Sequence, residues 1–84
     1  MKKEFDLNHQ YQLYLQRVGI KDESKLHPVQ RIEMRRVFFG AVGQLLLLLR
    51  DDLTKYSEEE GEKILKGMLQ QVTNFWLKEK NETN

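Results

Sequence analysis

The sequence predicts an all-α fold of three helices with a long central helix, in a bundle that we expect oligomerisation to complete. Apolar residues recur at steps of three and four along most of the chain, and no segment shows the apolar–polar alternation of a strand. The one proline stands at an expected helix start. At 84 residues, the chain is expected to form a single helical domain over 1–84.

The first helix is expected over about 6–18. Asp6 can cap its start through its carboxylate, and Gly19 followed by apolar Ile20 is typical of a left-handed helix end. The polar segment 21–26 predicts a connection. The residues that share the apolar face of this helix are Leu7, Tyr11, Tyr14, Leu15 and Val18.

The second helix is expected over about 28–56 and begins at His27-Pro28, because proline is tolerated at the first helical position. Its apolar residues form two groups on nearly opposite sides. The first group is Met34, Val37, Phe38, Ala41, Leu45, Leu48 and Leu49, and the second is Ile32, Phe39, Leu46 and Leu47. Either the first and third helices both cover this helix, or another subunit covers part of it.

The third helix is expected over about 57–79, and residues 81–84 are expected to form a flexible tail. Ser57 and Glu60 have the spacing of a capping box, and Lys78 and Lys80 suit a helix C-terminus. The apolar face of this helix consists of Ile64, Leu65, Met68, Leu69, Val72, Phe75 and Trp76.

Composition excludes several classes of protein. Fourteen basic and thirteen acidic residues leave a net charge of +1, so no global field attracts nucleic acid or an anionic membrane. The absence of cysteine excludes thiolate chemistry and fits a reducing compartment. The polar N-terminus does not resemble a signal peptide, and the run Leu45–Leu49 is too short to span a membrane. We therefore expect a cytoplasmic protein with no membrane partner.

Enzyme signatures are missing from the sequence. It contains no phosphate loop, no G-x-S-x-G and no HExxH, and His9 and His27 have no carboxylates at metal-ligand spacing. Helix capping explains the acidic run 58–60 without a metal. The sequence thus predicts a protein that is not an enzyme and uses no cofactor and no metal.

A polar strip on the second helix is the candidate ligand site. Glycine inside a helix costs about 1 kcal/mol relative to alanine, so Gly40 and Gly43 need a reason: close helix packing, or room for a ligand. Arginines near the helix N-terminus would favour an anion such as phosphate. The predicted ligand-binding residues are Arg31, Glu33, Arg35, Arg36, Gly40 and Gln44. In the alternative reading, Glu33 pairs with a neighbouring arginine on a solvated face.

Aromatic and apolar residues next to the strip predict an interface, and we expect a homo-oligomer in which the strip recurs about a two-fold axis. The predicted interface residues are Phe38, Phe39, Gly43, Leu46, Leu47 and Trp76.

The same stretch carries a resemblance. The segments Leu26-His27-Pro28-Val29-Gln30, Glu33-Met34-Arg35-Arg36, Phe38-Phe39-Gly40 and Gly43-Gln44 resemble a family of short uncharacterised proteins of tailed phages and prophages. The likeness extends weakly to Glu59-Glu60-Gly61 and Phe75-Trp76. It implies the cytoplasm of an infected or lysogenic bacterium, and it assigns no residue a role.

Three functions follow as hypotheses. The first is an oligomeric sponge that sequesters a small, anionic, nucleotide-like ligand made as a host defence signal. The second is a protein-interaction module that inhibits a host factor or serves in virion assembly. The third is a DNA-binding helix carrying Arg31, Arg35 and Arg36, which the near-zero net charge disfavours, so nucleic acid is not an expected partner.

Overall fold

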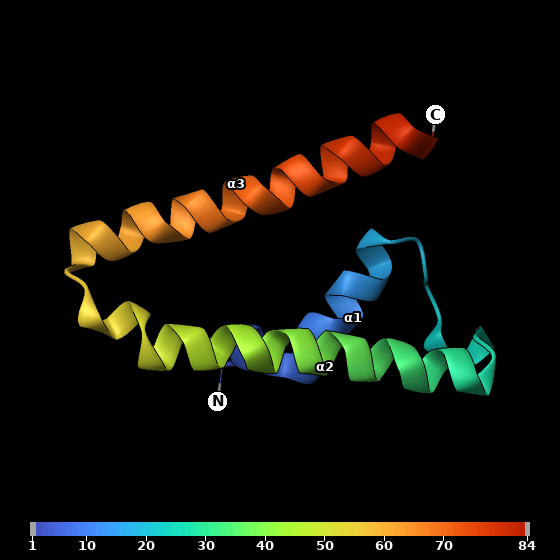
Figure 1. The fold of residues 1–84 in the computed structure, drawn as a ribbon. Coiled ribbons are helices and arrows are strands. Elements are labelled where there is room, and N and C mark those ends of the chain that lie inside the picture. The colour runs from blue at the N-terminus through green and yellow to red at the C-terminus, as the bar shows by residue number, and fades with distance from the viewer. Residues whose placement is uncertain (1, 84) are drawn as a thin grey trace. The chain divides into compact units, whose positions relative to one another are not determined.

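The computed structural model describes residues 2–83, with the side chains of 2–81. Its long helices are α1 (Leu7–Arg17), α2 (Pro28–Asp51) and α3 (Glu58–Thr83), as Figure 1 shows. Short 3₁₀ helices precede each of them, at Lys3–Phe5, Glu23–Lys25 and Leu53–Lys55. No strand occurs among residues 2–83, so the prediction of an all-α fold with three helices is confirmed.

The chain divides into two compact units, Met1–Leu45 and Leu46–Asn84. Helix α2 is continuous across the boundary between them. The expected single domain and its completion by oligomerisation stay predictions.

The start and end of α1 agree with the sequence. The Asp6 carboxylate accepts a hydrogen bond from the Asn8 backbone N–H at 3.1 Å, which caps the first turn. Gly19 has a φ of 86°, in the left-handed region that glycine adopts without strain. The N–H of Ile20 donates to the Leu15 carbonyl at 2.8 Å, which closes the helix as predicted.

Helix α2 begins where the sequence predicts, but it ends earlier. The Val29 N–H donates to His27 Nδ1 at 3.2 Å, which caps the start. The expected extension to residue 56 is wrong, because α2 ends at Asp51. The Thr54 hydroxyl donates to the Arg50 carbonyl at 2.8 Å and so satisfies a backbone group at the end of the helix. A 3₁₀ turn over Leu53–Lys55 follows.

Helix α3 starts at its predicted capping box and extends beyond the expected end. The Glu60 N–H donates to Ser57 Oγ at 3.2 Å, and the Ser57 hydroxyl donates to Glu60 Oε1 at 3.2 Å. The expected end at residue 79 and the tail over 81–84 are wrong as far as Thr83, which is still helical. No glycine or proline follows Gly67 to stop the helix. Asn84 lies outside the described residues.

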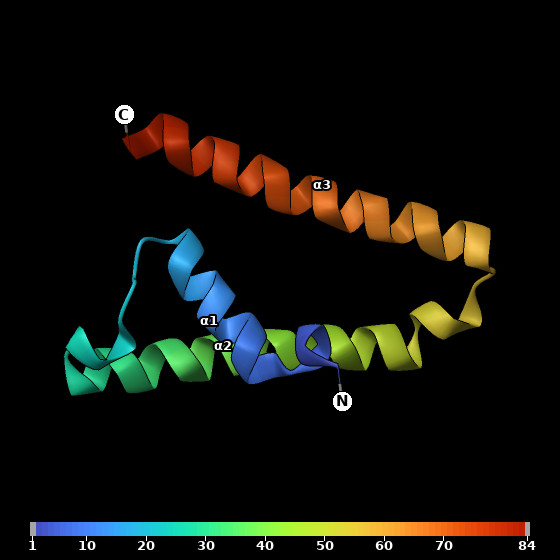
Figure 2. The ribbon, with the colours of Figure 1, turned by 180° about the vertical axis from the view of Figure 1, so that it is seen from behind.

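The core of the first unit forms where α1 lies against α2 (Figure 2). Tyr11 and Leu15 are fully buried. The Tyr11 ring centroid lies 5.1 Å from that of Phe38 and 6.2 Å from that of Phe39, and the Tyr14 and Phe38 centroids are 5.8 Å apart. Such offset aromatic contacts add to the free energy of burial, so this cluster fixes α1 on α2.

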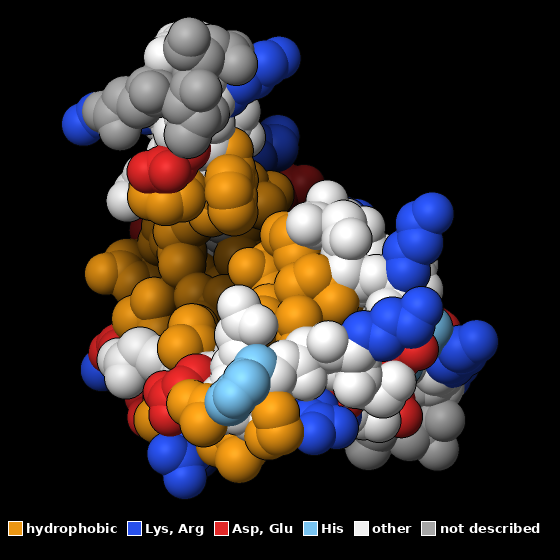
Figure 3. All heavy atoms as spheres, turned by 90° about the vertical axis from the view of Figure 1, so that its right-hand side faces the viewer, with side chains coloured by type: hydrophobic (Ala, Val, Ile, Leu, Met, Phe, Trp, Pro, Cys, Tyr) orange, Lys and Arg blue, Asp and Glu red, His pale blue; other side chains and the backbone are white. Residues whose placement is uncertain are grey.

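Many other large hydrophobic side chains stay exposed in both units, and they cover much of the surface in Figure 3. On the described part of the chain, no helix combines the length and the apolar character needed to cross a membrane. An apolar surface of this extent marks a binding surface more often than a solvated one.

Candidate functional site: an apolar groove beside a charged strip

Arg35 holds the connection between α1 and α2. Its Nε donates to Glu23 Oε2 and its Nη2 to Glu23 Oε1, both at 3.1 Å, so the pair is bidentate. Its Nη1 donates to Asn8 Oδ1 at 3.3 Å. The guanidinium carbon also lies 4.9 Å from the centroid of the Tyr11 ring, a cation–π distance.

This network involves one of the predicted ligand-binding residues. The Arg35 guanidinium contacts Glu23, Asn8 and Tyr11, and ligand binding by Arg35 stays a prediction. Sequence reasoning missed Glu23 and Asn8 as its partners. No local signal could have found them, because Glu23 sits in an irregular connection and Asn8 is far away in the chain.

The Tyr11 hydroxyl lies beside this network. It is buried and has no hydrogen-bond partner. Burial raises the pKa of Tyr11 above its ordinary value, and the negative charge of Glu23 raises it further. The hydroxyl therefore stays protonated over the physiological range. Tyr11 stabilises the unit through the packing of its ring more than through polar contacts of its hydroxyl.

Most of the other predicted ligand-binding residues are exposed to solvent. Arg36 Nη1 lies 3.5 Å from Glu33 Oε1, with the two side chains 75% and 60% exposed. This is the pairing on a solvated face that the sequence left open as an alternative, and exposed pairs of this kind add little stability. Gly40 and Gln44 are exposed and Arg31 is half-buried. Ligand binding by these residues stays a prediction.

The helical glycines are not explained by packing within the first unit. Apart from the chain neighbours and the nearby backbone of α2 itself, a Cβ added at Gly40 or Gly43 would meet no atom of the described residues within 4 Å. Each glycine costs about 1 kcal/mol relative to alanine in a helix interior, and no packing contact within the first unit offsets that cost.

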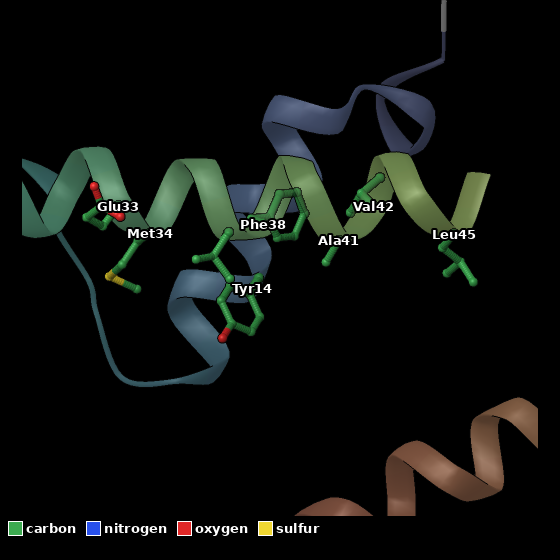
Figure 4. Close-up of a pocket in the computed structure, with 8 residues that line it drawn as sticks. Tyr14, Glu33, Met34, Phe38, Ala41, Val42 and Leu45 are labelled. Atoms are coloured by element: carbon green, nitrogen blue, oxygen red, sulfur yellow. The ribbon is translucent and has the colours of Figure 1, made fainter. Parts of the chain in front are cut away.

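An open apolar groove lies beside the strip in the first unit, with a volume of about 490 Å³. Tyr14 of α1 forms one side and α2 forms the rest (Figure 4). The lining residues are Tyr14, Glu33, Met34, Val37, Phe38, Ala41, Val42 and Leu45. Glu33 is the one charged group among them, so the groove suits an apolar ligand or helix and disfavours an anion. The sequence had placed most of this face on one side of the helix.

The predicted interface residues occupy different environments. Phe38 belongs to the aromatic core of the first unit, and Phe39 lies at the edge of that core. Leu46 and Leu47 are exposed on α2. Trp76 is exposed on α3, with its ring 5.2 Å from that of Phe75 in an edge-on contact. Gly43 is half-buried.

A protein metal site needs several histidine, aspartate or glutamate side chains close together. Within residues 2–83, no group of three or more histidine, aspartate or glutamate side chains could hold a metal ion.

No protein-family model matches the chain, and neither a curated protein nor a solved structure matches it. The resemblance to short phage and prophage proteins therefore stays a prediction from the residues quoted above.

Proposed function

We propose that this protein is a non-enzymatic binding protein that works as a homo-oligomer, with copies pairing through an apolar seam on α2. The seam consists of Ile32, Phe39 and Leu46, which recur at intervals of seven residues and are 50%, 38% and 47% exposed. Residues seven apart on a helix lie along one line and pack well against a second helix. This exposed seam is the observation that carries the proposal.

Gly43 supports the same reading, since it lies between Phe39 and Leu46 on that side of α2. Its open surroundings leave room for the backbone of a second helix to approach. A contact with another copy would supply the reason for this glycine that the first unit lacks.

Protein association is better supported than the sponge hypothesis. Arg35 is engaged within the fold, and Arg36 already has Glu33 beside it. The surface around them is dominated by apolar side chains, which bind helices more readily than phosphate. Nucleotide sequestration therefore stays a prediction from the sequence, and inhibition of a host protein or a part in virion assembly is the role we favour for the oligomer.

Sedimentation velocity over a range of concentrations tests the proposal. We expect the wild type to sediment above the 10.1 kDa of one chain. Ile32→Glu places a charge in the seam and should shift the protein toward the monomer by at least about tenfold in dissociation constant, because a buried charge costs well over 1.4 kcal/mol. Helicity should be retained, since the new carboxylate lies one turn before Arg36.

Gln44→Glu is the matched control, because this exposed residue lies on the same helix but away from the seam. It should leave the dissociation constant within about twofold, as surface changes usually do. A wild-type protein that stays monomeric at every concentration would contradict the proposed function.

A further inference from the structure

A second groove of the first unit runs along α1 and has a volume of about 360 Å³. Residues three and four apart share a helix face, so the α1 side of the lining forms one stripe. At 1.5 Å per residue, the stripe is about 15 Å long. It consists of Leu7, Gln10, Tyr14 and Arg17, and Phe38 and Val42 line the groove from α2. We refer to this site as the α1 groove.

The floor of the α1 groove is apolar and rests on the core of the first unit. Phe38 and Val42 are half-buried. The Phe38 ring centroid lies 5.8 Å from that of Tyr14 and 5.1 Å from that of the buried Tyr11. Because these contacts already hold the floor in place, little conformational freedom is lost when a ligand binds on it.

Arg17 gives the α1 groove a charge at one end. Among the described residues that line this groove, Arg17 is the one charged side chain, and it lies in the last turn of α1. No acidic side chain within residues 2–81 forms an ion pair with it, whereas Arg35 contacts Glu23. A guanidinium presents its donors in a planar fork that matches the two oxygens of a carboxylate.

We infer that the α1 groove binds a free aliphatic carboxylate. The carboxylate pairs with Arg17, and the alkyl chain extends along the stripe toward Leu7 and covers Phe38 and Val42. Burial of the chain supplies affinity, and the single charged contact fixes the orientation of the ligand. An aliphatic cation of the same length would place its charge beside Arg17, and the repulsion disfavours it.

The larger groove described above adjoins the α1 groove and shares Tyr14, Phe38 and Val42 with it. Its charged lining residue is Glu33, which repels a carboxylate. The charged end of the ligand is therefore directed to Arg17, and a longer chain can continue over Phe38 into the larger groove. The inference uses different residues of α2 from the seam and does not depend on self-association.

Titration with dodecanoate, kept below the concentration at which it forms micelles, tests the inference by NMR of the methyl groups. We expect shifts at the methyl groups of Leu7, Leu13 and Val42, which line the α1 groove. Leu69 and Val72 are exposed on α3 and should change little. Since all exposed apolar side chains can adsorb a surfactant, this comparison separates binding in the groove from adsorption.

Charge variants test the role of Arg17. Arg17→Gln should weaken dodecanoate binding roughly tenfold, or about 1.4 kcal/mol, as expected for the loss of a hydrogen bond to a charged group. Arg17→Glu should reverse the preference, so that dodecyltrimethylammonium binds more tightly than dodecanoate. Lys21→Gln is the matched control, because it removes the same charge from an exposed residue outside the groove and should change affinity by no more than about twofold. Circular dichroism checks that each variant is folded.

Each outcome decides the inference. Shifts in the α1 groove with an affinity that depends on Arg17 support it. Equal binding of dodecanoate and dodecyltrimethylammonium by the wild type would overturn it, as would shifts confined to α3 or equal effects of Arg17→Gln and Lys21→Gln. Sedimentation of the same samples keeps the two proposals apart. A monomer that binds dodecanoate through Arg17 supports the inference and contradicts the proposed function, whereas an oligomer that does not bind it overturns the inference alone.

Discussion

Replacing Arg35 by methionine should weaken the packing of α1 on α2. Methionine keeps the aliphatic length of the side chain but loses the bidentate contact to Glu23, the hydrogen bond to Asn8 and the cation–π contact to Tyr11. The Glu23 carboxylate, whose side chain is only 18% exposed, then stays partly desolvated without its partner.

A buried pair would cost several kcal/mol, but the Arg35 side chain is 39% exposed and water screens part of the interaction. We therefore expect Arg35→Met to lower the free energy of unfolding by about 1–2 kcal/mol. Urea unfolding followed by circular dichroism measures it. The protein concentration is held fixed, because oligomerisation contributes to apparent stability.

Arg36→Met is the matched comparison, because Arg36 is next in sequence and its pair with Glu33 is exposed. That change should alter the free energy of unfolding by no more than about 0.5 kcal/mol. Equal effects of the two substitutions would refute the argument that the Glu23 contact holds the first unit together.

Four further predictions concern stability. Tyr11→Phe removes a buried hydroxyl without a partner, so unfolding free energy at neutral pH should stay within about 0.5 kcal/mol or rise, as a urea titration would show. Because the pKa of Tyr11 is raised in the fold, the contribution of Tyr11 to the free energy of unfolding is complete below the ordinary tyrosine pKa. That contribution is lost as pH rises through the raised value, so Tyr11→Phe should lessen the loss of stability at alkaline pH. Hydrogen bonds from Ser24 lower the pKa of Asp22, so the contribution of Asp22 to the free energy of unfolding is present above the ordinary carboxyl pKa and is lost as pH falls through the lowered pKa. Asp22→Asn should therefore reduce the dependence of the unfolding free energy on pH in the acid range. Gly19→Ala should cost about 1 kcal/mol at a φ of 86°, whereas Gly67→Ala, in open space on α3, should stabilise by about 0.5–1 kcal/mol; equal signs in thermal melts would contradict this. Ser57→Ala should cost about 1 kcal/mol through loss of the α3 cap, and a melting temperature unchanged from the wild type would count against that role.

Local signals predicted most of the fold. Asp6, Gly19, Pro28 and Ser57 act at the helix ends where their chemistry placed them, because caps and left-handed ends depend on a few neighbouring residues. The end of α2 at Asp51 was not predicted, because it depends on a side-chain hydrogen bond to the backbone. Thr54 bonds back to the Arg50 carbonyl, and helix propensity alone does not reveal such competition.

The candidate site was only partly predictable. Helical periodicity had already placed the α2 residues that line the groove, such as Met34 and Ala41, on one face. Periodicity says nothing of which charged groups pair across the chain, so it could not separate Arg35, held by Glu23, from Arg36, which stays solvated. That distinction depends on where the irregular connection after α1 returns to α2.

The contacts between α1 and α2 also affect how fast the first unit folds. The hydrogen bond from Arg35 to Asn8 joins residues 27 positions apart, and the ring contact between Tyr11 and Phe38 closes a loop of the same size. Loops this short close at little entropic cost, and helical proteins organised by such local contacts fold in microseconds to milliseconds. The side chains of the aromatic core are then exposed to solvent only briefly after synthesis. This short exposure limits the time in which unfolded chains can aggregate.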